Sequence, residues 1–80
     1  MWYVYLLKCN DDTIYVGITT SIERRVKEHN TSNKGAKYTR MRRPVVLLKY
    51  FEFENRSLAS KEEYRIKHLT KKQKLELCLN

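Results

Sequence analysis

The fold is decided by two apolar runs, Tyr3-Val4-Tyr5-Leu6-Leu7 and Thr13-Ile14-Tyr15-Val16-Gly17-Ile18, and by the polar segment Asn10-Asp11-Asp12 between them. Both runs are rich in β-branched and aromatic residues, which are enriched in strands, whereas Asn and Asp are typical of turns. The pattern therefore predicts a β-hairpin at the start of the chain.

The pairing register of this hairpin determines which tyrosines meet. If Cys9 pairs with Thr13 across a three-residue loop, Tyr5 faces Gly17 on the neighbouring strand. Tyr5 and Tyr15 then lie as diagonal neighbours on one face of the sheet. A slip of one residue would separate them, and the turn residues alone do not fix the register.

A helix is predicted after the hairpin, because Thr20 and Glu23 have the Thr-x-x-Glu spacing of a capping box. At about 100° per residue, Ile22 and Val26 form an inward stripe on this helix, which should end at about His29.

Arg25 and His29 lie four residues apart along the edge of that stripe. A buried arginine needs an acceptor, so Arg25 could pair with an internal carboxylate while His29 is a satisfied boundary histidine. Alternatively, both could face an anion lodged between the helix and the sheet. Periodicity leaves the two interpretations open.

The rest of the chain is predicted to add one strand and two helices. Residues 36–43 have room for one helical turn, and the apolar run 45–48 predicts a strand covered on both faces. Residues 49–54 alternate, so one face there should become solvent-exposed. Helices are expected from about Leu58 to Leu69 and after a Thr70–Gln73 cap, the last with Leu75 and Leu79 docked inward.

Residues 1–80 are therefore expected to form a single domain of the α/β (α+β) class. Its core is a small, three-stranded, mostly antiparallel sheet flanked by helices. The expected element order is strand, strand, helix, strand, helix, helix.

Composition indicates a cytoplasmic protein without a membrane anchor. Hydrophobic residues make up 41% of the chain, enough for a globular fold, and no apolar run is long enough to cross a bilayer. Cys9 and Cys78 lie at opposite ends without a pairing signature, so free thiols in a reducing compartment are expected.

The net charge of +8 is concentrated in one block that is opposed only by Glu28. Its members are Arg24, Arg25, Lys27, Lys34, Lys37, Arg40, Arg42 and Arg43. Such a block predicts a polyanionic partner, most simply nucleic acid, although a solvated basic surface would look the same. Tyr38, set among these cations, could stack or hydrogen-bond to a nucleic-acid strand, or could simply pack.

The tyrosines, the following glycine and the arginine together resemble the signature of GIY-YIG nuclease domains. The first motif corresponds to Tyr3-Val4-Tyr5, the second to Tyr15-Val16-Gly17, and the arginine to Arg25. Tyr3 departs from the pattern, because it occupies the position of the first glycine. A small stand-alone bacterial branch, the UPF0213 (UvrC-like) proteins, is still more similar, in Gly17-Ile18-Thr19-Thr20, Glu23-Arg24-Arg25, Gly35-Ala36-Lys37 and Glu63-Tyr64-Arg65-Ile66-Lys67.

The resemblance implies a metal-dependent hydrolysis of phosphodiester bonds in DNA or, less favoured, in structured RNA. Tyr15 or Tyr5 would deprotonate or orient the water, with Tyr15 favoured as the base. The implied catalytic residues are Tyr5, Tyr15, Arg25, His29 and Glu63. Substrate contacts are expected from Gly17, which would leave room for the phosphate, and from Lys34, Lys37, Tyr38, Arg40, Arg42 and Arg43.

The metal is expected to be Mg²⁺ or another divalent cation held by one carboxylate, with water and substrate oxygens as the other ligands. A helical wheel places Glu62 in the middle of the expected buried stripe and Glu63 towards its edge. That stripe consists of Leu58, Ala59, Ile66 and Leu69. The family pattern selects Glu63, which is our choice, with Glu62 as the alternative.

Two other functions fit the same sequence. The chain could be a nucleic-acid-binding module that keeps the fold but cleaves little or not at all, or its basic surface could dock an acidic protein. A separate protein partner could also supply the specificity that so short a chain has little room to encode.

Overall fold

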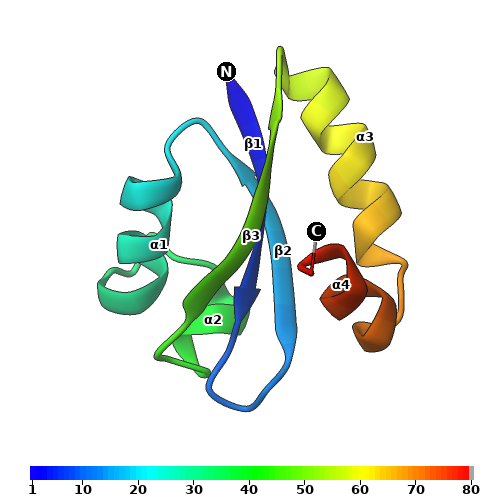
Figure 1. The fold of residues 1–80 in the computed structure, drawn as a ribbon. Helices are drawn as coiled ribbons and strands as arrows, with labels where there is room; N and C mark the ends of the chain where they lie inside the picture. Colours follow the sequence, from blue (N-terminus) through cyan, green and yellow to red (C-terminus); the bar gives the residue numbers. More distant parts are fainter. Residues whose placement is uncertain (80) are drawn as a thin grey trace.

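The computed structural model describes residues 1–79 of the chain. Its antiparallel sheet has three strands, β1 (Trp2–Lys8), β2 (Ile14–Thr19) and β3 (Val46–Phe53), in the order β2-β1-β3. The helices are α1 (Ile22–Thr31), α2 (Lys37–Arg40), α3 (Arg56–Lys67) and α4 (Lys71–Leu77). Figure 1 shows α1 on one side of the sheet and α3 and α4 on the other. The predicted fold class and element order are confirmed, and α2 is the single helical turn expected within residues 36–43.

The hairpin has the predicted register. The Cys9 N–H donates to the Thr13 carbonyl at 2.9 Å, and Tyr5 pairs with Gly17 across β1 and β2. Asp12 closes the loop with φ at 67°, a left-handed conformation that Asp tolerates better than most residues. The turn therefore places Tyr5 and Tyr15 on the same face of the sheet.

The central strand β1 supplies the core on both faces. Tyr5 and Leu7 lie on the α1 side, where Ile22 and Val26 pack against their cluster as predicted. Val4 and Leu6 lie on the α3 side in a cluster that includes Val16, Ala59 and Ile66. Burial of a side chain such as Leu6 contributes about 1.5–3 kcal/mol, so the two clusters fix α1 and α3 on opposite faces of the sheet.

Helix boundaries correct the predictions for α1 and α3. The N-cap of α1 is Ser21, whose side chain accepts a hydrogen bond from the Arg24 N–H, so the predicted Thr20–Glu23 box was wrong. Strand β2 continues to Thr19. The Thr19 hydroxyl accepts a hydrogen bond from the Ser21 N–H at 3.1 Å, and this contact positions Ser21 as the cap in place of Thr20. Helix α3 begins two residues earlier than predicted, because Asn55 caps it.

Two burial predictions for the second half of the chain were also wrong. Strand β3 lies at the edge of the sheet and pairs only with β1, so Val46 is 59% exposed instead of covered on both faces. In α4 the Thr70–Gln73 capping box is present, but Leu75 and Leu79 are exposed. Leu77 and Cys78 pack against the core cluster in their place, because the helix turns these positions towards the sheet.

Cys9 and Cys78 are free thiols, as predicted. Within residues 1–79 there is no helix of the length and apolarity needed to span a bilayer.

Candidate active site

The centre of the site is a contact between Tyr5, Tyr15 and His29. The Tyr5 hydroxyl lies 2.7 Å from His29 Nε2, and both side chains are almost completely buried. The Tyr15 ring lies 6.3 Å from the Tyr5 ring and 5.1 Å from the imidazole, measured between ring centres. Tyr15 is only half-buried, so it is the member of the group that faces solvent.

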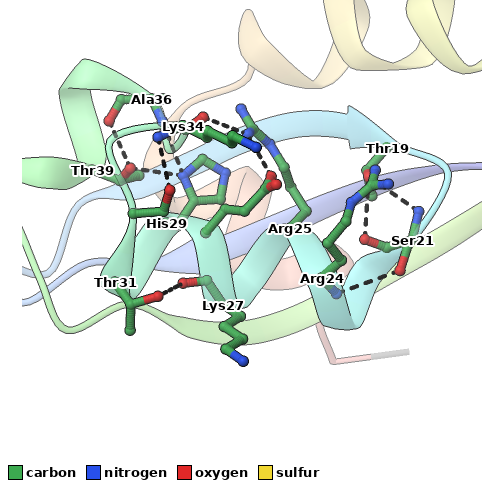
Figure 2. Close-up of polar contacts among 12 residues, drawn as sticks. Thr19, Ser21, Arg24, Arg25, Lys27, His29, Thr31, Lys34, Ala36 and Thr39 are labelled. Atoms are coloured by element: carbon green, nitrogen blue, oxygen red, sulfur yellow. Dashed lines mark hydrogen bonds and ion pairs between the residues drawn. The ribbon is translucent and has the colours of Figure 1, made fainter.

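The far side of the imidazole is held by the segment before β3. His29 Nδ1 lies 2.7 Å from the Thr39 hydroxyl and accepts a hydrogen bond from the Ala36 N–H at 3.3 Å (Figure 2). The Thr39 hydroxyl in turn donates to the Ala36 carbonyl at 2.8 Å, so the imidazole is held on one side by this segment and on the other by Tyr5.

Burial shifts the pKa of both groups away from neutrality. Desolvation, followed by the positive charge of Arg25, lowers the pKa of His29 from 6.5 to about 4. Desolvation raises the pKa of Tyr5 to about 12, although Arg25 opposes the shift. At neutral pH, His29 is uncharged and Tyr5 keeps its proton.

Gly17 makes room for the Tyr5 ring. A Cβ built at Gly17 would lie 2.7 Å from Tyr5 Cζ and closer still to the hydroxyl oxygen, well inside the 3.5–4.0 Å at which carbon atoms are in contact. The space above Gly17 is therefore filled by the phenol and is not open to a phosphate.

Arg25 lies at the edge of the site, half-exposed, where α1 faces the end of β2. One guanidinium nitrogen donates to the Glu28 carboxylate at 3.0 Å and to the Lys34 carbonyl at 2.7 Å (Figure 2). The sequence left open whether Arg25 pairs with a carboxylate or faces an anion. The structure shows a carboxylate partner, Glu28, which belongs to the same helix as Arg25.

The two candidate carboxylates point to different surroundings. The negative charge of Glu63 contributes to the raised pKa of Tyr5, so Glu63 lies within electrostatic range of the tyrosine group. Glu62 instead pairs with Arg65 and lines a small hollow with Phe51 on the β3 side. Within residues 1–79, no three His, Cys, Asp or Glu side chains gather into a metal-binding group.

The basic segment reaches the site through Tyr38. Its ring stacks on Tyr15 at 5.9 Å with an interplanar angle of 29°, and the Arg42 guanidinium lies 3.8 Å from the centre of the Tyr38 ring. Arg42 also pairs with Asp11 at 2.9 Å. Lys34, Lys37 and Arg40 are exposed cations on the same segment. Tyr38 packs within the chain but is still 38% exposed, so it can also contact a nucleic-acid strand. The two roles considered for this residue are therefore compatible.

Arg43 is used inside the chain. Its guanidinium donates to the His29 carbonyl at 2.6 Å and to the Ser32 carbonyl at 2.5 Å, at the end of α1 where carbonyls lack helical partners. Arg43 therefore fastens the end of the helix that carries Arg25 and His29.

Arg43→Ala is expected to lower the free energy of unfolding by about 2 kcal/mol, because hydrogen bonds from a charged donor are lost. The matched control is Arg40→Ala, which removes an exposed cation and should change stability by less than about 0.5 kcal/mol. Urea unfolding of both variants measures the difference. Equal midpoints for the two variants would show that Arg43 is not a structural clamp.

Thr39 is the site residue that sequence reasoning missed. Its side chain is completely buried and bridges His29 Nδ1 and the Ala36 carbonyl, at 2.7 and 2.8 Å. A threonine between Tyr38 and Arg40 gives no local signal of such a contact, because the contact depends on how the loop returns to α1.

Comparison with known families and structures shows what the chain is similar to. The family model described as the GIY-YIG catalytic domain matches residues 1–76. A UPF0213 protein of Desulfotalea psychrophila is 54% identical over 76 residues, which are 95% of this chain and 69% of that protein. A UPF0213 protein of Clostridium perfringens is 55% identical over 78 residues, covering 96% of this chain and 82% of the relative.

Two structures solved by solution NMR are also similar. The UPF0213 protein of Bacillus halodurans has a TM-score of 0.59 at 45% identity, over 96% of this chain and 82% of that one. A protein of E. faecalis has a TM-score of 0.63 at 49% identity, over 94% of this chain and 79% of that one.

Proposed function

The chain belongs to the GIY-YIG catalytic domain family, a nuclease-like family, and on this premise we propose that it is a metal-dependent endonuclease that hydrolyses phosphodiester bonds, with DNA favoured over RNA. One observation carries the proposal: Tyr5, Tyr15 and His29 are in contact, with Arg25 beside them and the charge of Glu63 in range. The tyrosines and His29 come from β1, β2 and α1, whereas Glu63 comes from α3 on the other side of the sheet.

Tyr15 is the better base of the two tyrosines. Hydrolysis needs a group that takes a proton from the attacking water while the oxygen bonds to phosphorus and the leaving oxygen departs. Tyr5 is unsuited, because it is buried and its pKa is raised to about 12. Tyr15 is half-exposed, and no other described side chain hydrogen-bonds to its hydroxyl within residues 1–79, so water can reach it.

Tyr5 and Arg25 are assigned to the charge that gathers on the phosphate. The Tyr5 hydroxyl is held by His29 Nε2 at 2.7 Å and would donate a hydrogen bond to a phosphate oxygen. Arg25 offers a planar fork that suits phosphate, with one nitrogen already oriented by Glu28 and Lys34. Both donors are fixed before substrate arrives, which is the arrangement that stabilises a transition state most effectively.

Glu63 would hold the metal. Its side chain is 22% exposed and its partner is the surface residue Lys67, at 3.4 Å, so a cation can displace the lysine. One carboxylate, completed by water and substrate oxygens, fits Mg²⁺. The bound metal would supply Lewis-acid stabilisation of the phosphate and of the leaving oxygen.

Glu63→Gln is expected to reduce nicking of supercoiled DNA in Mg²⁺ by about 10²-fold, because metal-ion stabilisation is worth several kcal/mol. Glu62→Gln is the matched control and should keep most of the activity, since that carboxylate pairs with Arg65 away from the tyrosines. Initial rates with Mg²⁺ and with a chelator measure both effects.

Three results would argue against parts of this assignment. If Glu62→Gln is the damaged variant, the metal ligand is Glu62. If the wild-type protein binds polynucleotides in a salt-sensitive manner but never cleaves them, the chain is a binding module of the same fold. If it neither binds nor cleaves, the proposed function is wrong.

A further inference from the structure

A hollow of about 300 Å³ lies beside Arg25, where the end of β2 meets the beginnings of α1 and α3. We call it the Trp2 hollow. Its lining includes the aromatic ring of Trp2, three arginines, Arg24, Arg25 and Arg56, and the single carboxylate of Glu28. Arg25 belongs both to the hollow and to the edge of the tyrosine site, so the two are neighbours.

Within residues 1–79, the hollow carries more positive charge than its one carboxylate can balance. Glu28 is committed to Arg25 at 3.0 Å. The guanidinium groups of Arg24 and Arg56 form no ion pair or hydrogen bond with another side chain within residues 1–79. By contrast, partners inside the chain engage the guanidinium groups of Arg25, Arg42, Arg43 and Arg65. Two open guanidinium forks at one hollow are suited to an anion with several oxygens.

Trp2 adds an aromatic surface to this cationic site. The ring packs against the core cluster on the α3 side yet stays half-exposed, and the Arg56 guanidinium lies 5.5 Å from a Trp2 ring centre. An aromatic side chain next to a basic groove is how proteins bind single-stranded nucleic acid, since every base can stack on it.

We propose that the Trp2 hollow binds one unpaired nucleotide that flanks the scissile phosphate, with its base against Trp2 and its phosphate between Arg24 and Arg56. This inference rests on the proposed nuclease function. Ligand pockets range from about 300 to 1,000 Å³, so the Trp2 hollow has room for a unit the size of one nucleotide and not for a helix. A base within a duplex has its faces covered by stacking and cannot contact the indole.

The substrate of the enzyme is therefore nucleic acid with a single-stranded segment next to the cleaved bond. Fully paired duplex would have to release a base before it could fill the hollow, at a cost of a few kcal/mol.

Trp2 is the only tryptophan in the chain, so its fluorescence reports directly on the hollow. The wild-type protein is titrated, with a chelator present to prevent cleavage, with a short single-stranded oligonucleotide and with a blunt duplex of the same sequence. Anisotropy of a label on the nucleic acid measures binding independently. Single strands should change the tryptophan emission in a saturable manner, whereas the duplex should change it much less.

Charge variants test the phosphate contacts. Arg56→Ala and Arg24→Ala should each weaken single-strand binding on the order of tenfold and reduce the slope of log K against log salt by about 0.7. Lys61→Ala is the matched control, because it removes an exposed cation from α3 that does not line the hollow. It should change affinity much less, and thermal unfolding verifies that all three variants are folded.

Three outcomes would overturn the inference while leaving the nuclease proposal intact, because nicking and anisotropy are measured separately. They are binding without a change in tryptophan emission, equal changes with single strand and duplex, and equal effects of Arg56→Ala and Lys61→Ala. Absence of both binding and cleavage for every polynucleotide would overturn the two proposals together.

Discussion

Tyr15→Phe is expected to reduce the rate of phosphodiester cleavage by about 10²–10⁴-fold, the range that a general base contributes. The change removes only the hydroxyl oxygen. The ring can keep its contacts with Tyr38 at 5.9 Å and with His29 at 5.1 Å, so the fold and the affinity for nucleic acid should be retained. Initial nicking rates in Mg²⁺, anisotropy and thermal unfolding measure the three properties.

Tyr5→Phe is the informative companion. It removes the buried hydrogen-bond partner of His29 Nε2, and an unsatisfied buried group costs about 1–3 kcal/mol. Tyr5→Phe should therefore lower stability as well as rate, whereas Tyr15→Phe should lower the rate alone. Full activity in Tyr15→Phe would exclude Tyr15 as the base.

The hairpin could be predicted because it is local. The loop between Cys9 and Thr13 sets the register, and the register sets the diagonal contact of Tyr5 with Tyr15. The period of α1 likewise placed His29 at the edge of the buried stripe. These features depend on neighbours in sequence, for which turn and helix geometry are sufficient.

Features that depend on tertiary placement could not be predicted from the sequence. Arg43 belongs to the basic segment by composition, yet it clamps the end of α1, because the chain returns across that helix before β3. Thr39 reaches His29 for the same reason. The choice between Glu62 and Glu63 depends on how α3 is rotated about its axis relative to the sheet. Leu58 was expected in the buried stripe of this helix but is exposed, so the rotation differs from the one assumed.

Gly17 has a different structural role from the expected one. The resemblance implied a glycine that leaves room for the phosphate. Its small size instead allows the Tyr5 ring to lie across β2 and reach His29. Packing of the Tyr5 ring therefore accounts for the absence of a side chain at this position.

The second large effect that we expect is a fall in the free energy of unfolding when the pH is lowered. The pKa of His29 is 6.5 in the unfolded chain and about 4 in the folded protein, chiefly because of burial. Between these values the unfolded chain binds a proton that the folded protein excludes, so acidification favours unfolding. The free energy of unfolding should fall by about 3 kcal/mol between pH 6.5 and pH 4, at about 1.4 kcal/mol per pH unit.

That loss is large for this chain, because domains are stable by only about 0.05–0.15 kcal/mol per residue. Urea unfolding across the pH range measures the loss, and NMR titration of the His29 ring measures its cause. His29→Gln is the control: its amide can hydrogen-bond to both Thr39 and Tyr5 but does not titrate, so most of the dependence above pH 4 should disappear. An imidazole that titrates near 6.5 in the folded protein would contradict the prediction, because the buried pair with Tyr5 would then tolerate the charge. A depressed pKa of His29 and a raised pKa of Tyr5 mean that the pair stays uncharged throughout the physiological range.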